Sequence, residues 1–452
     1  MYFKTQKFLV VGASRSGIAA TKLLIENGAV CYIYDDSESP LIVKSIEGLV
    51  GLGAITVDKT QLNERLDEVD VVVLSPGVAI DHEIPIAAKK LGKRIIGELE
   101  LGFTLCKSPI VAVTGTNGKT TTCTLIRDIL NDENNRAVLC GNAGIPLSAV
   151  LGDLDKNSIA VAEVSSFQLE TVWSFCPHVA VITNITPDHL SRHYNMENYI
   201  FLKGKILSNM RESEYAVLNH DDATVVKFSE KTKAKCVFFS IKNEVNGAYV
   251  SDGKIYYKGK YIMDTAEIPI GGAHNVLNVL AAVCVAKIMG IADDEIAQKI
   301  RIFKGVKHRI QFIKTVDGVD YYNDSKATNA DATLKAVDSM KKPTVLILGG
   351  KDKGLPFDGL FERLKNSEVK HVVLTGESRY TLLESAKKAR FDCVSVTEDF
   401  EIAFKIAQIT ANDGDCVLLS PACSSFDAFS DYEERGDKFI SLVEGIDGGN
   451  KS

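Results

Sequence analysis

The sequence predicts an α/β protein with doubly wound parallel sheets, because short apolar runs alternate with helical stretches along most of the chain. A chain of 452 residues is long enough for about three domains of ordinary size. The pattern changes near residues 97 and 305, which suggests domains at 1–97, 98–305 and 306–452. We therefore expect three domains.

The first of these sections carries a glycine-rich turn after an apolar run that ends at Gly12. Gly12 and Gly17 match the first and last glycines of a dinucleotide-binding turn, and Asp35 follows the next apolar run. The middle glycine of that pattern lets a pyrophosphate approach closely, and here it is Ser14. This section is expected to hold a nucleotide sugar, although a nicotinamide-dependent dehydrogenase stays an alternative.

The strongest local signal in the central section is T-G-T-N-G-K-T-T at residues 114–121, between an apolar strand and a helical stretch. The glycines let the backbone wrap around phosphate, and the N–H groups at the helix start attract it. Lys119 would reach the β- and γ-phosphates, and Thr120 would offer its hydroxyl to Mg²⁺. The full pattern has one more glycine, five residues before Gly118, where this chain has Val113.

Two later runs of the central section end in groups that can bind a metal. Glu163 ends one strand, and His189 lies in the loop after the next. Because the carboxyl ends of parallel strands share one edge of the sheet, both should lie near the phosphate loop. Glu163 is expected to bind Mg²⁺, whereas His189 is equally compatible with a structural role.

The central section ends with a different pattern. Short aromatic and β-branched runs between residues 249 and 261 are separated by Asp252-Gly253 and Lys258-Gly259. These pairs are typical of β-hairpin turns, so we expect a small antiparallel part here. An apolar helix is expected from residue 275 to about residue 288.

The third section returns to alternating strands and helices. The loops 349–353 and 420–427 follow two of its apolar runs and should share one edge of the sheet. A cationic loop beside a hydroxyl-rich loop suits a small dicarboxylate. His308-Arg309 and the segment 323–329 offer a guanidinium for phosphate and a carboxylate for ribose, although by themselves solvated turns are the commoner explanation for them.

Composition excludes several classes of function. The net charge of −7 gives no reason to expect nucleic-acid or membrane binding, since both favour a basic surface. The 10 cysteines lack metal-ligand spacing and are typical of reduced, mostly buried thiols. Neither a secretory signal nor an apolar run of ~20 residues is present. We expect a soluble cytoplasmic protein, with a disordered tail after Glu444.

Taken in order, the motifs resemble those of the Mur ligase family over nearly the whole chain. The shared motifs are T-G-T-N-G-K-T-T at 114–121, E-x-S-S-F-Q-L-E at 163–170, N-x-T-x-D-H-L at 184–190, A-H-N-x-x-N at 273–278 and H-R at 308–309. N-D-S-K-A-T-N at 323–329 and S-P-A-C-S-S-F-D-x-F at 420–429, with Arg435-Gly436 after it, resemble the members that add D-glutamate.

The resemblance implies an N-terminal Rossmann-like domain for a UDP-linked substrate, a central P-loop ATPase-type domain and a C-terminal Rossmann-like domain for the amino acid. It implies two Mg²⁺ ions and a carbamylated lysine. The implied catalytic residues are Lys119, Glu163, His189 and Lys203, and the implied metal ligands are Thr120, Glu163, His189 and Lys203. Lys205 is a nearby alternative to Lys203 for the carbamylated lysine.

The same resemblance implies the binding residues. ATP would contact Gly115, Thr116, Asn117, Gly118, Lys119, Thr120, Thr121, Asn275, Asn278, Arg309 and Asp324. The UDP-linked substrate would contact Ser14, Arg15, Ser16, Asp35, Asp36, Ser75, Pro76, Gly77 and Asn142, with Ser165 and Gln168 as further substrate contacts. D-Glutamate would contact Thr328, Lys353, Ser425 and Phe426, with Lys326 and Tyr432 nearby and Lys351 as the alternative to Lys353.

The implied activity is the ATP-dependent addition of D-glutamate to UDP-N-acetylmuramoyl-L-alanine through an acyl phosphate, by a monomer, in peptidoglycan precursor synthesis. Mg²⁺ and Lys119 would offset the repulsion among the anionic reactants. The closest alternative is a sister Mur ligase, or a ligase like folylpolyglutamate synthase, that uses another amino acid. A non-catalytic nucleotide-binding scaffold is the remaining alternative.

Overall fold

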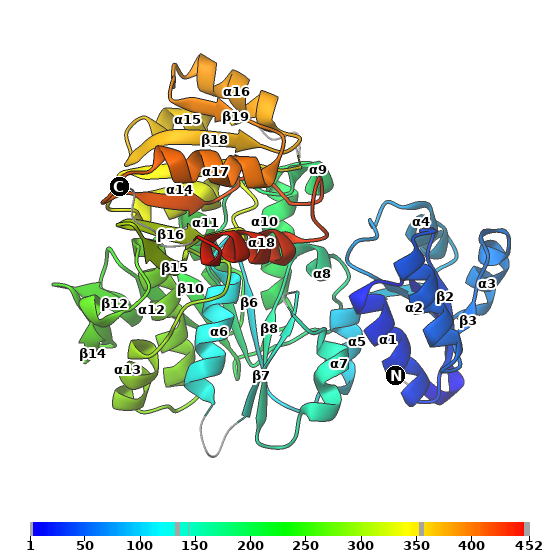
Figure 1. Ribbon diagram of the computed structural model, residues 1–452. Coiled ribbons are helices and arrows are strands. Elements are labelled where there is room, and N and C mark those ends of the chain that lie inside the picture. The colour runs from blue at the N-terminus through cyan, green and yellow to red at the C-terminus, as the bar shows by residue number, and fades with distance from the viewer. Residues whose placement is uncertain (1–2, 132–135, 143, 352–356, 447–452) are drawn as a thin grey trace. The chain divides into compact units, whose positions relative to one another are not determined.

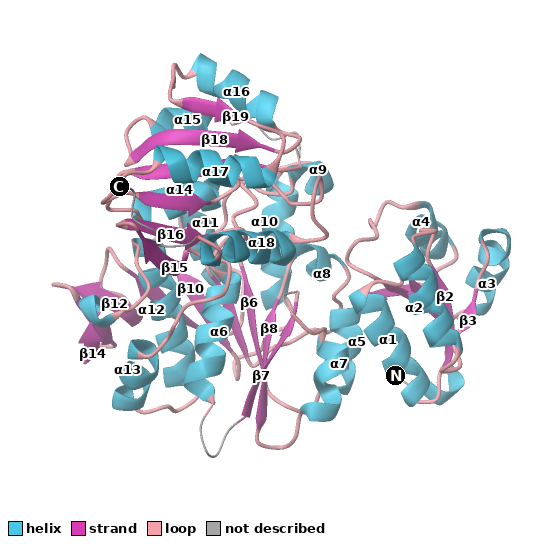
Figure 2. Cartoon of the chain, in the orientation of Figure 1, coloured by secondary structure: helices cyan, strands magenta, loops and turns pink. Residues whose placement is uncertain are grey.

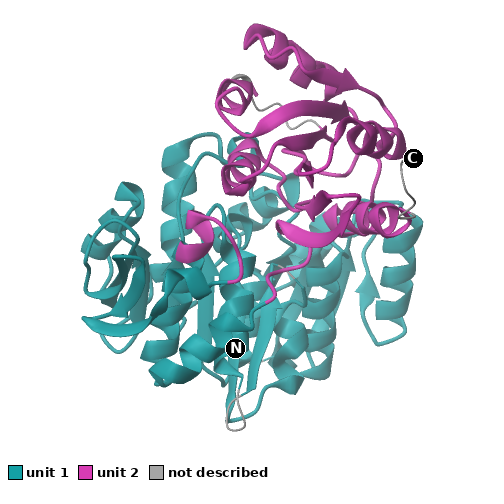
Figure 3. Cartoon of the chain, turned by 60° about the vertical axis from the view of Figure 1, so that its left-hand side comes forward, with its two compact units in different colours: residues 1–268, 277–303 teal, residues 269–276, 304–452 magenta. Residues whose placement is uncertain are grey.

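The chain folds into two compact units, one of residues 1–268 and 277–303 and the other of residues 269–276 and 304–452 (Figure 3). The structure is a computed structural model, and it describes residues 3–131, 136–142, 144–351 and 357–446. The first unit contains two sheets and the second contains one. Figure 1 labels their strands and helices, and Figure 2 shows helices packed beside the strands.

The N-terminal sheet of the first unit has five parallel strands in the order β3-β2-β1-β4-β5. They are β1 (Lys7–Val11), β2 (Val30–Tyr34), β3 (Ile55–Thr56), β4 (Val71–Leu74) and β5 (Arg94–Gly97). Phe8 and Val10 of β1 pack on the side of α1 (Arg15–Glu26) and α2 (Pro40–Val50). Leu9 and Val11 pack on the side of α3 (Leu62–Glu68) and α4 (Glu83–Lys90). Because successive side chains of a strand face opposite ways, helices cover both faces, as expected for a doubly wound sheet.

The central sheet of the first unit has nine strands in the order β14-β13-β12-β11-β10-β9-β6-β8-β7. They are β6 (Ile110–Thr114), β7 (Arg136–Gly141), β8 (Ser158–Glu163), β9 (Val179–Ile182), β10 (Tyr215–Asn219), β11 (Lys235–Ser240), β12 (Gly247–Ser251), β13 (Lys254–Tyr257) and β14 (Lys260–Asp264). The strands from β7 to β12 pair in parallel, and β12, β13 and β14 pair antiparallel. The two hairpin turns fall at Asp252-Gly253 and Lys258-Gly259, all with positive φ, which confirms the prediction.

The helices around this sheet are α5 (Glu98–Leu105), α6 (Lys119–Leu130), α7 (Leu147–Val150), α8 (Ser166–Glu170), α9 (Leu190–His193), α10 (Met196–Gly204), α11 (Ala223–Val226), α12 (Ala273–Ile288) and α13 (Asp293–Arg301). The stretch 279–286 of α12 is at most 1% exposed at any residue. Burial on all sides accounts for the nearly continuous apolar sequence of this helix.

The sheet of the second unit has six strands in the order β15-β16-β20-β17-β18-β19. They are β15 (Gln311–Val316), β16 (Val319–Asn323), β17 (Thr344–Gly349), β18 (Val369–Thr375), β19 (Val394–Val396) and β20 (Cys416–Leu419). The core on one face includes residues of α14 (Ala330–Ser339), α15 (Asp358–Leu364) and α16 (Arg379–Lys388). The core on the other face includes residues of α17 (Phe400–Thr410) and α18 (Tyr432–Glu444). This sheet is therefore also doubly wound.

The second unit differs from the expected strand–helix alternation at its first strand. β15 pairs antiparallel with β16, whereas the other five strands are parallel. The connection is the pair Asp317-Gly318, with φ values of 49° and 76°. An Asp-Gly pair between two alternating runs is itself a hairpin signal, so this turn was recognisable in the sequence.

Three further expectations concern the chain as a whole. All ten cysteines are free thiols, and only Cys393 is exposed, which agrees with the expected buried, reduced state. None of the helices in the described ranges combines the length and apolar character of a membrane span. Helix α18 ends at Glu444, and most of the tail expected to be disordered, residues 447–452, lies outside the described residues.

Candidate active site

The phosphate loop predicted at 114–121 connects β6 to α6, which begins at Lys119. Gly115 and Gly118 have φ values of 143° and 85°. Residues other than glycine rarely adopt such positive φ values. A Cβ on Gly118 would lie 2.3 Å from Asn278 Oδ1, so the loop also requires its glycines for space. Val113, where the full pattern has a glycine, is a buried strand residue paired with Val181, and the turn starts after it.

The loop after β9 holds the phosphate loop in place. Thr116 donates its backbone N–H to the Asn184 carbonyl at 2.9 Å, and Asn117 donates its N–H to Asn184 Oδ1 at 3.0 Å. Thr116 Oγ1 also contacts the Thr186 carbonyl at 3.0 Å and the Tyr199 hydroxyl at 3.1 Å. The N-x-T segment at 184–186 therefore shapes the loop from one side.

Thr120 and Glu163 lie side by side at the carboxyl edge of the central sheet. Thr120 Oγ1 donates to Glu163 Oε2 at 2.6 Å, and the two residues are 5% and 2% exposed. Asn142 donates its side-chain amide to Glu163 Oε1 at 2.9 Å. A buried carboxylate and a hydroxyl next to a phosphate loop form an oxygen donor set that suits Mg²⁺. Asn142, expected to contact the UDP-linked substrate, thus lies on this carboxylate.

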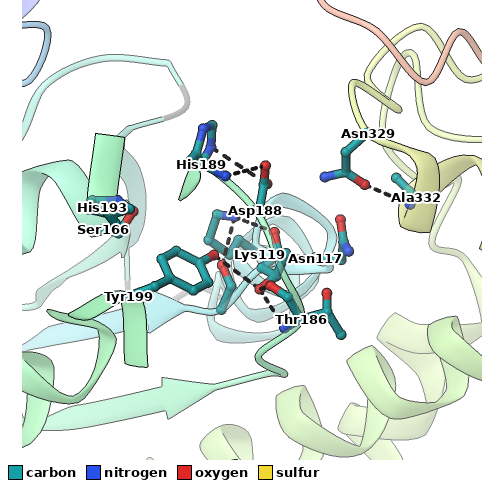
Figure 4. Close-up of polar contacts among 12 residues, drawn as sticks. Asn117, Lys119, Ser166, Thr186, Asp188, His189, His193, Tyr199, Asn329 and Ala332 are labelled. Atoms are coloured by element: carbon teal, nitrogen blue, oxygen red, sulfur yellow. Dashed lines mark hydrogen bonds and ion pairs between the residues drawn. The ribbon is translucent and has the colours of Figure 1, made fainter. Parts of the chain in front are cut away.

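His189 immediately precedes helix α9 as its N-cap and has a left-handed backbone, with a φ of 53°. Its N–H is bonded to Asp188 Oδ1 at 2.9 Å (Figure 4), and its ring lies 4.9 Å from that of Phe167. Left-handed backbone is unfavourable for a residue with a side chain, so it marks a local constraint at a functional candidate. His189 is half-buried, and its Nε2 lies 3.6 Å from Asp188 Oδ2.

Lys203 is almost completely buried in helix α10, at 2% exposure. Its Nζ donates to the Gly115 carbonyl at 2.8 Å and to Thr114 Oγ1 at 3.2 Å. Burial, and then the charge of Lys119, hold the pKa of the Lys203 amine well below its usual range. Lys205, the alternative, instead donates to the Glu170 carbonyl at 2.9 Å and does not point at the phosphate loop.

A cavity of about 270 Å³ lies at the carboxyl edge of the N-terminal sheet. Its lining residues are Val11, Gly12, Tyr34, Asp35, Asp36, Gly77, Val78, Ala79 and His82. Three residues predicted for the UDP-linked substrate, Asp35, Asp36 and Gly77, are thus brought together. Tyr34 and His82 were not predicted, and only their positions at the end of β2 and immediately before α4 could have signalled them.

The other residues predicted around this cavity do not line it. Ser14, Arg15 and Ser16 lie at the start of α1 outside the lining, as does Pro76. Ser75 is buried and donates to the Gly12 carbonyl at 2.9 Å, so it closes the turn. Asp35 accepts the N–H of Ala13 at 2.6 Å and therefore also shapes that turn.

Ser165 and Gln168 form a capping box at the start of α8. Ser165 donates its N–H to Gln168 Oε1 at 3.0 Å, and Gln168 donates its N–H to Ser165 Oγ at 3.2 Å. Gln168 is 4% exposed. These contacts assign both side chains a structural task at the N-terminus of the helix beside Glu163.

The second unit has its own polar centre at Asp324. This carboxylate is 4% exposed and accepts from Ser420 Oγ at 2.8 Å and from the Ile310 N–H at 3.2 Å. Burial raises the pKa of Asp324 to about 7, against the hydrogen bond from Ser420 and the charge of Arg309, which lower it. The charge of Arg309 therefore acts on Asp324, as expected for two residues predicted to contact the same ligand.

Arg435 connects the two loops that were expected to hold D-glutamate. It donates to Ser325 Oγ at 3.0 Å, to the Ser325 carbonyl at 2.8 Å and to the Cys423 carbonyl at 3.1 Å, and it is 2% exposed. A guanidinium can bind several acceptors at once because its five donors have a fixed geometry. The motif Arg435-Gly436 was noted in the sequence, but nothing in it indicated this bridging role.

The remaining predicted contacts for D-glutamate lie around these loops. Lys326 Nζ is 4.7 Å from the centre of the Tyr432 ring, a cation–π contact. Phe426 is 69% exposed, whereas the neighbouring Ser425 is buried. Thr328 donates its N–H to the Lys326 carbonyl at 3.0 Å. Lys353 lies outside the described residues.

Two further predicted residues are asparagines of helix α12, one in each unit. Asn278, in the first unit, accepts from Thr122 Oγ1 at 3.2 Å beside the phosphate loop. Asn275, in the second unit, donates its side-chain amide to the Gly271 carbonyl at 2.7 Å. Thr121, also predicted for ATP, is buried in the first turn of α6.

Comparison with known proteins identifies the family. Three family models match consecutive parts of the chain: the Mur ligase MurD-like N-terminal domain at 6–97, the Mur ligase middle domain at 113–286 and the Mur ligase glutamate ligase domain at 308–423. The UDP-N-acetylmuramoylalanine--D-glutamate ligase of Thermoanaerobacter sp. (strain X514) is 43% identical, over 98% of this chain and 99% of that protein. The protein of the same name from Lachnospira eligens is 40% identical over 99% and 100%. The chain belongs to the Mur ligase family.

Solved structures of Mur ligases share the fold. UDP-N-acetylmuramate-alanine ligase MurC from Thermotoga maritima superimposes with a TM-score of 0.62 at 22% identity, covering 97% of this chain and 99% of that one. MurF from Acinetobacter baumannii gives a TM-score of 0.64 at 17% identity, covering 97% and 93%. The family resemblance and the three-domain α/β fold are thereby confirmed for this Mur ligase. The domain boundaries and the roles of the individual site residues stay predictions.

Proposed function

We propose that this Mur ligase joins D-glutamate to UDP-N-acetylmuramoyl-L-alanine, using ATP, in peptidoglycan precursor synthesis. The observation that carries the proposal is the identity of 40–43%, over nearly the whole length, to relatives named UDP-N-acetylmuramoylalanine--D-glutamate ligase. The motifs at 323–329 and 420–429 support the same amino acid. Both motifs meet at Arg435, so they form one loop system in the second unit.

The chemistry must convert a poor acyl donor into a good one. A carboxylate cannot lose oxide, so its oxygen first takes the γ-phosphoryl group of ATP and ADP leaves. The amine of D-glutamate then attacks the acyl carbon, and inorganic phosphate leaves as the amide forms. Lys119, at the N-terminus of α6, is proposed to hold the phosphate oxygens together with the loop N–H groups.

Thr120 and Glu163 are proposed to hold a Mg²⁺ ion, and His189 a second one. The donor set fits, because a hydroxyl and a buried carboxylate lie 2.6 Å apart beside the phosphate loop. When bound, Mg²⁺ would neutralise charge on the transferring phosphoryl group. Without a cation, the buried Glu163 carboxylate would lie beside anionic phosphates, and that arrangement is unfavourable.

Lys203 is proposed to be carbamylated. A neutral amine attacks CO₂ and loses a proton to give a carbamate, and an ammonium cannot do this. Burial already favours the neutral amine at Lys203. The modification would turn this neutral amine into an anion that can bind Mg²⁺ jointly with His189.

The cavity of Asp35, Asp36 and Gly77 is proposed to hold the UDP part of the substrate. Its size, about 270 Å³, and its two carboxylates suit the hydroxyls and ring N–H of a nucleoside rather than its phosphates. For D-glutamate we propose Thr328, Ser425, Phe426 and Lys353, with Lys326 and Tyr432 nearby. Lys351 is paired with Glu377 at 2.6 Å, which favours Lys353 as the cation for this dicarboxylate.

The setting of the reaction is part of the same proposal. ATP and UDP-linked sugars are cytoplasmic metabolites, so we propose a cytoplasmic monomer whose partners are its small-molecule substrates. No nucleic-acid or membrane partner is proposed, given a net charge of −7.

The decisive experiment offers a panel of amino acids to the purified protein with ATP, Mg²⁺ and UDP-N-acetylmuramoyl-L-alanine. D-Glutamate should support phosphate release and a new amide product, and L-alanine, L-lysine and L-glutamate should not. A preference for one of the other amino acids would replace the proposal with a sister ligase. ATP binding without any product would leave only a nucleotide-binding scaffold.

A further inference from the structure

The short helix α9 contacts a loop of the N-terminal sheet, 77–82, from within the same unit. Arg192 Nη2 donates to the Val78 carbonyl at 3.0 Å, and Nη1 lies 3.5 Å from the Gly77 carbonyl. Two residues later, the Tyr194 hydroxyl donates to the Asp81 carboxylate. Loop 77–82 is therefore attached to α9 at two points.

The guanidinium of Arg192 is fixed on its other side. Its Nε and Nη2 donate to the two oxygens of Glu170 at 3.2 and 2.6 Å, and it stacks over the Phe167 ring at 5.0 Å. The side chains of Arg192 and Glu170 are 18% and 7% exposed. A fork-like ion pair that is largely shielded and also stacked is rigid, unlike an exposed surface pair.

Helix α9 is itself anchored to α8. His193 Nε2 lies 2.9 Å from Ser166 Oγ (Figure 4), and its Nδ1 lies 3.5 Å from Glu170 Oε1. His193 is 1% exposed. The contact of His193 with Ser166 and the ion pair of Arg192 with Glu170 therefore both attach α9 to α8.

The two ends of this arrangement are sites that the proposed function uses. Gly77 and Val78 line the cavity with Asp35 and Asp36, and His189 immediately precedes α9. The proposed substrate carries UDP at one end and its reacting carboxylate at the other. A molecule that spans both sites reacts only if their separation matches its length, and a misplacement of about 1 Å can cost roughly 100-fold in rate.

We propose that Arg192 is a positioning residue that fixes the separation between the nucleotide-sugar cavity and His189. This inference rests on the proposed function and adds a residue to it. Arg192 holds the backbone of loop 77–82 and does not act on the reacting atoms. Tyr194 assists through Asp81, so its removal should have a smaller effect of the same sign.

The test compares Arg192→Ala, Arg192→Lys and Tyr194→Phe with Arg301→Ala, a matched control. Arg301 pairs with Glu267 at 2.5 Å but contacts neither loop 77–82 nor α9. Steady-state kinetics with the full UDP-linked substrate, calorimetric binding of UDP alone and thermal unfolding are measured for each. The affinity for UDP depends on the cavity alone, whereas the kinetics with the full substrate also depend on the separation between the cavity and His189.

For Arg192→Ala we expect kcat/KM for the full substrate to fall by about 100-fold, mainly through kcat, with UDP affinity within about threefold of wild type. Arg192→Lys should recover little, because an ammonium cannot replace the fork. Arg301→Ala should match wild type. Tyr194→Phe, which removes one hydroxyl from an exposed ring, keeps the test decisive if Arg192→Ala fails to fold.

Three results would overturn the inference: unchanged kinetics in folded Arg192 variants, a loss of UDP affinity equal to the loss in kcat/KM, or full activity of Arg192→Lys. The second would make Arg192 part of the cavity wall. Inactivity of the wild-type protein in the same assay would instead refute the proposed function, so the two failures are distinguishable.

Discussion

The side chain of Lys203 donates a 2.8 Å hydrogen bond to the backbone carbonyl of Gly115 in the phosphate loop. Lys119 donates to the same carbonyl oxygen at 2.9 Å. Two ammonium groups that share one acceptor repel each other, and burial amplifies that repulsion because water cannot screen it. The more buried amine, Lys203, is therefore the one that the fold keeps neutral and ready for modification.

Replacing Lys203 by alanine should lower the ligase activity by more than about 100-fold. The reason is that a metal ligand is lost, and not merely a residue that orients one. Acetate or another short carboxylate should restore part of that activity by occupying the space of the carbamate. Phosphate release dependent on D-glutamate and on added acetate is the measurement.

Lys205→Ala is the matched control for this pair. Lys205 lies two residues further along and donates to the Glu170 carbonyl, so its loss should lower activity little and show no rescue by acetate. Rescue of the Lys205 variant instead would move the carbamylated lysine to that position. A fully active Lys203→Ala would exclude Lys203 as a metal ligand.

Lys119→Ala should abolish ATP-dependent ligation while the protein stays folded, since the side chain donates to the Gly115 and Thr116 carbonyls of its own loop and is not part of a hydrophobic core. The physical reason is the loss of the cation that faces the β- and γ-phosphates. Phosphate release under saturating substrates measures the effect, and thermal unfolding checks the fold.

Lys299→Ala, at a lysine that contacts the far end of α6 through the Asn131 carbonyl, is the control and should keep its activity. Normal phosphate release by the Lys119 variant would reject the phosphate-loop assignment.

Much of this site could be predicted from the sequence because it lies at strand ends. The apolar runs before Thr114 and Glu163 fix where two parallel strands stop, and parallel strands bring their carboxyl ends to one edge. The hairpin turns at 252–253 and 258–259 follow from local turn chemistry in the same way. Local and periodic signals were sufficient for these parts.

Contacts between distant segments could not be predicted in this way. Arg435 reaches Ser325 across 110 positions, and Arg192 reaches Val78 across 114. The sequence around each of these two arginines looks the same as that of an ordinary solvent-exposed helix turn. Ser165, Gln168 and Ser75 show a further limit: their motif positions suggest ligand binding, but they do not reveal that these side chains also cap a helix or close a turn.

The pH dependence of stability should report on Asp324. Burial raises the pKa of this carboxyl to about 7, compared with ~3.9 in an unfolded chain. The stabilisation from binding this proton is fully present below pH ~4 and is lost as the pH rises through about 7. Asparagine resembles the protonated acid and does not titrate. Asp324→Asn should therefore gain stability relative to wild type as the pH rises from 4 to 7, by at most about 4 kcal/mol.

Urea unfolding of the two proteins between pH 4.5 and 7.5 gives the difference in the free energy of unfolding, with Asp320→Asn as a control of opposite sign. Burial tends to raise the pKa of Asp320, but hydrogen bonds from Lys342 and Thr315 prevail and lower it. Its ionised form is thus stabilising above pH ~4, so Asp320→Asn should lose stability there. A loss of stability in Asp324→Asn that grows with pH would mean that its interaction with Arg309 outweighs its burial.

The phosphate loop should tolerate no side chain at Gly118, for a reason that a second glycine can separate from backbone strain. Gly118 has a φ of 85°, and an added Cβ would lie 2.3 Å from Asn278 Oδ1. Gly92 has a φ of 68°, and an added Cβ there meets nothing within 4 Å. Alanine at either position carries the left-handed backbone penalty of about 1–2 kcal/mol.

Only Gly118→Ala should also push Asn278 away and weaken ATP binding, by at least about tenfold if one hydrogen bond to a charged group is lost. Calorimetry with ATP and Mg²⁺ measures the affinity, and urea unfolding measures the shared penalty. Equal ATP affinity in the two variants would show that the contact between Gly118 and Asn278 has no part in shaping the loop.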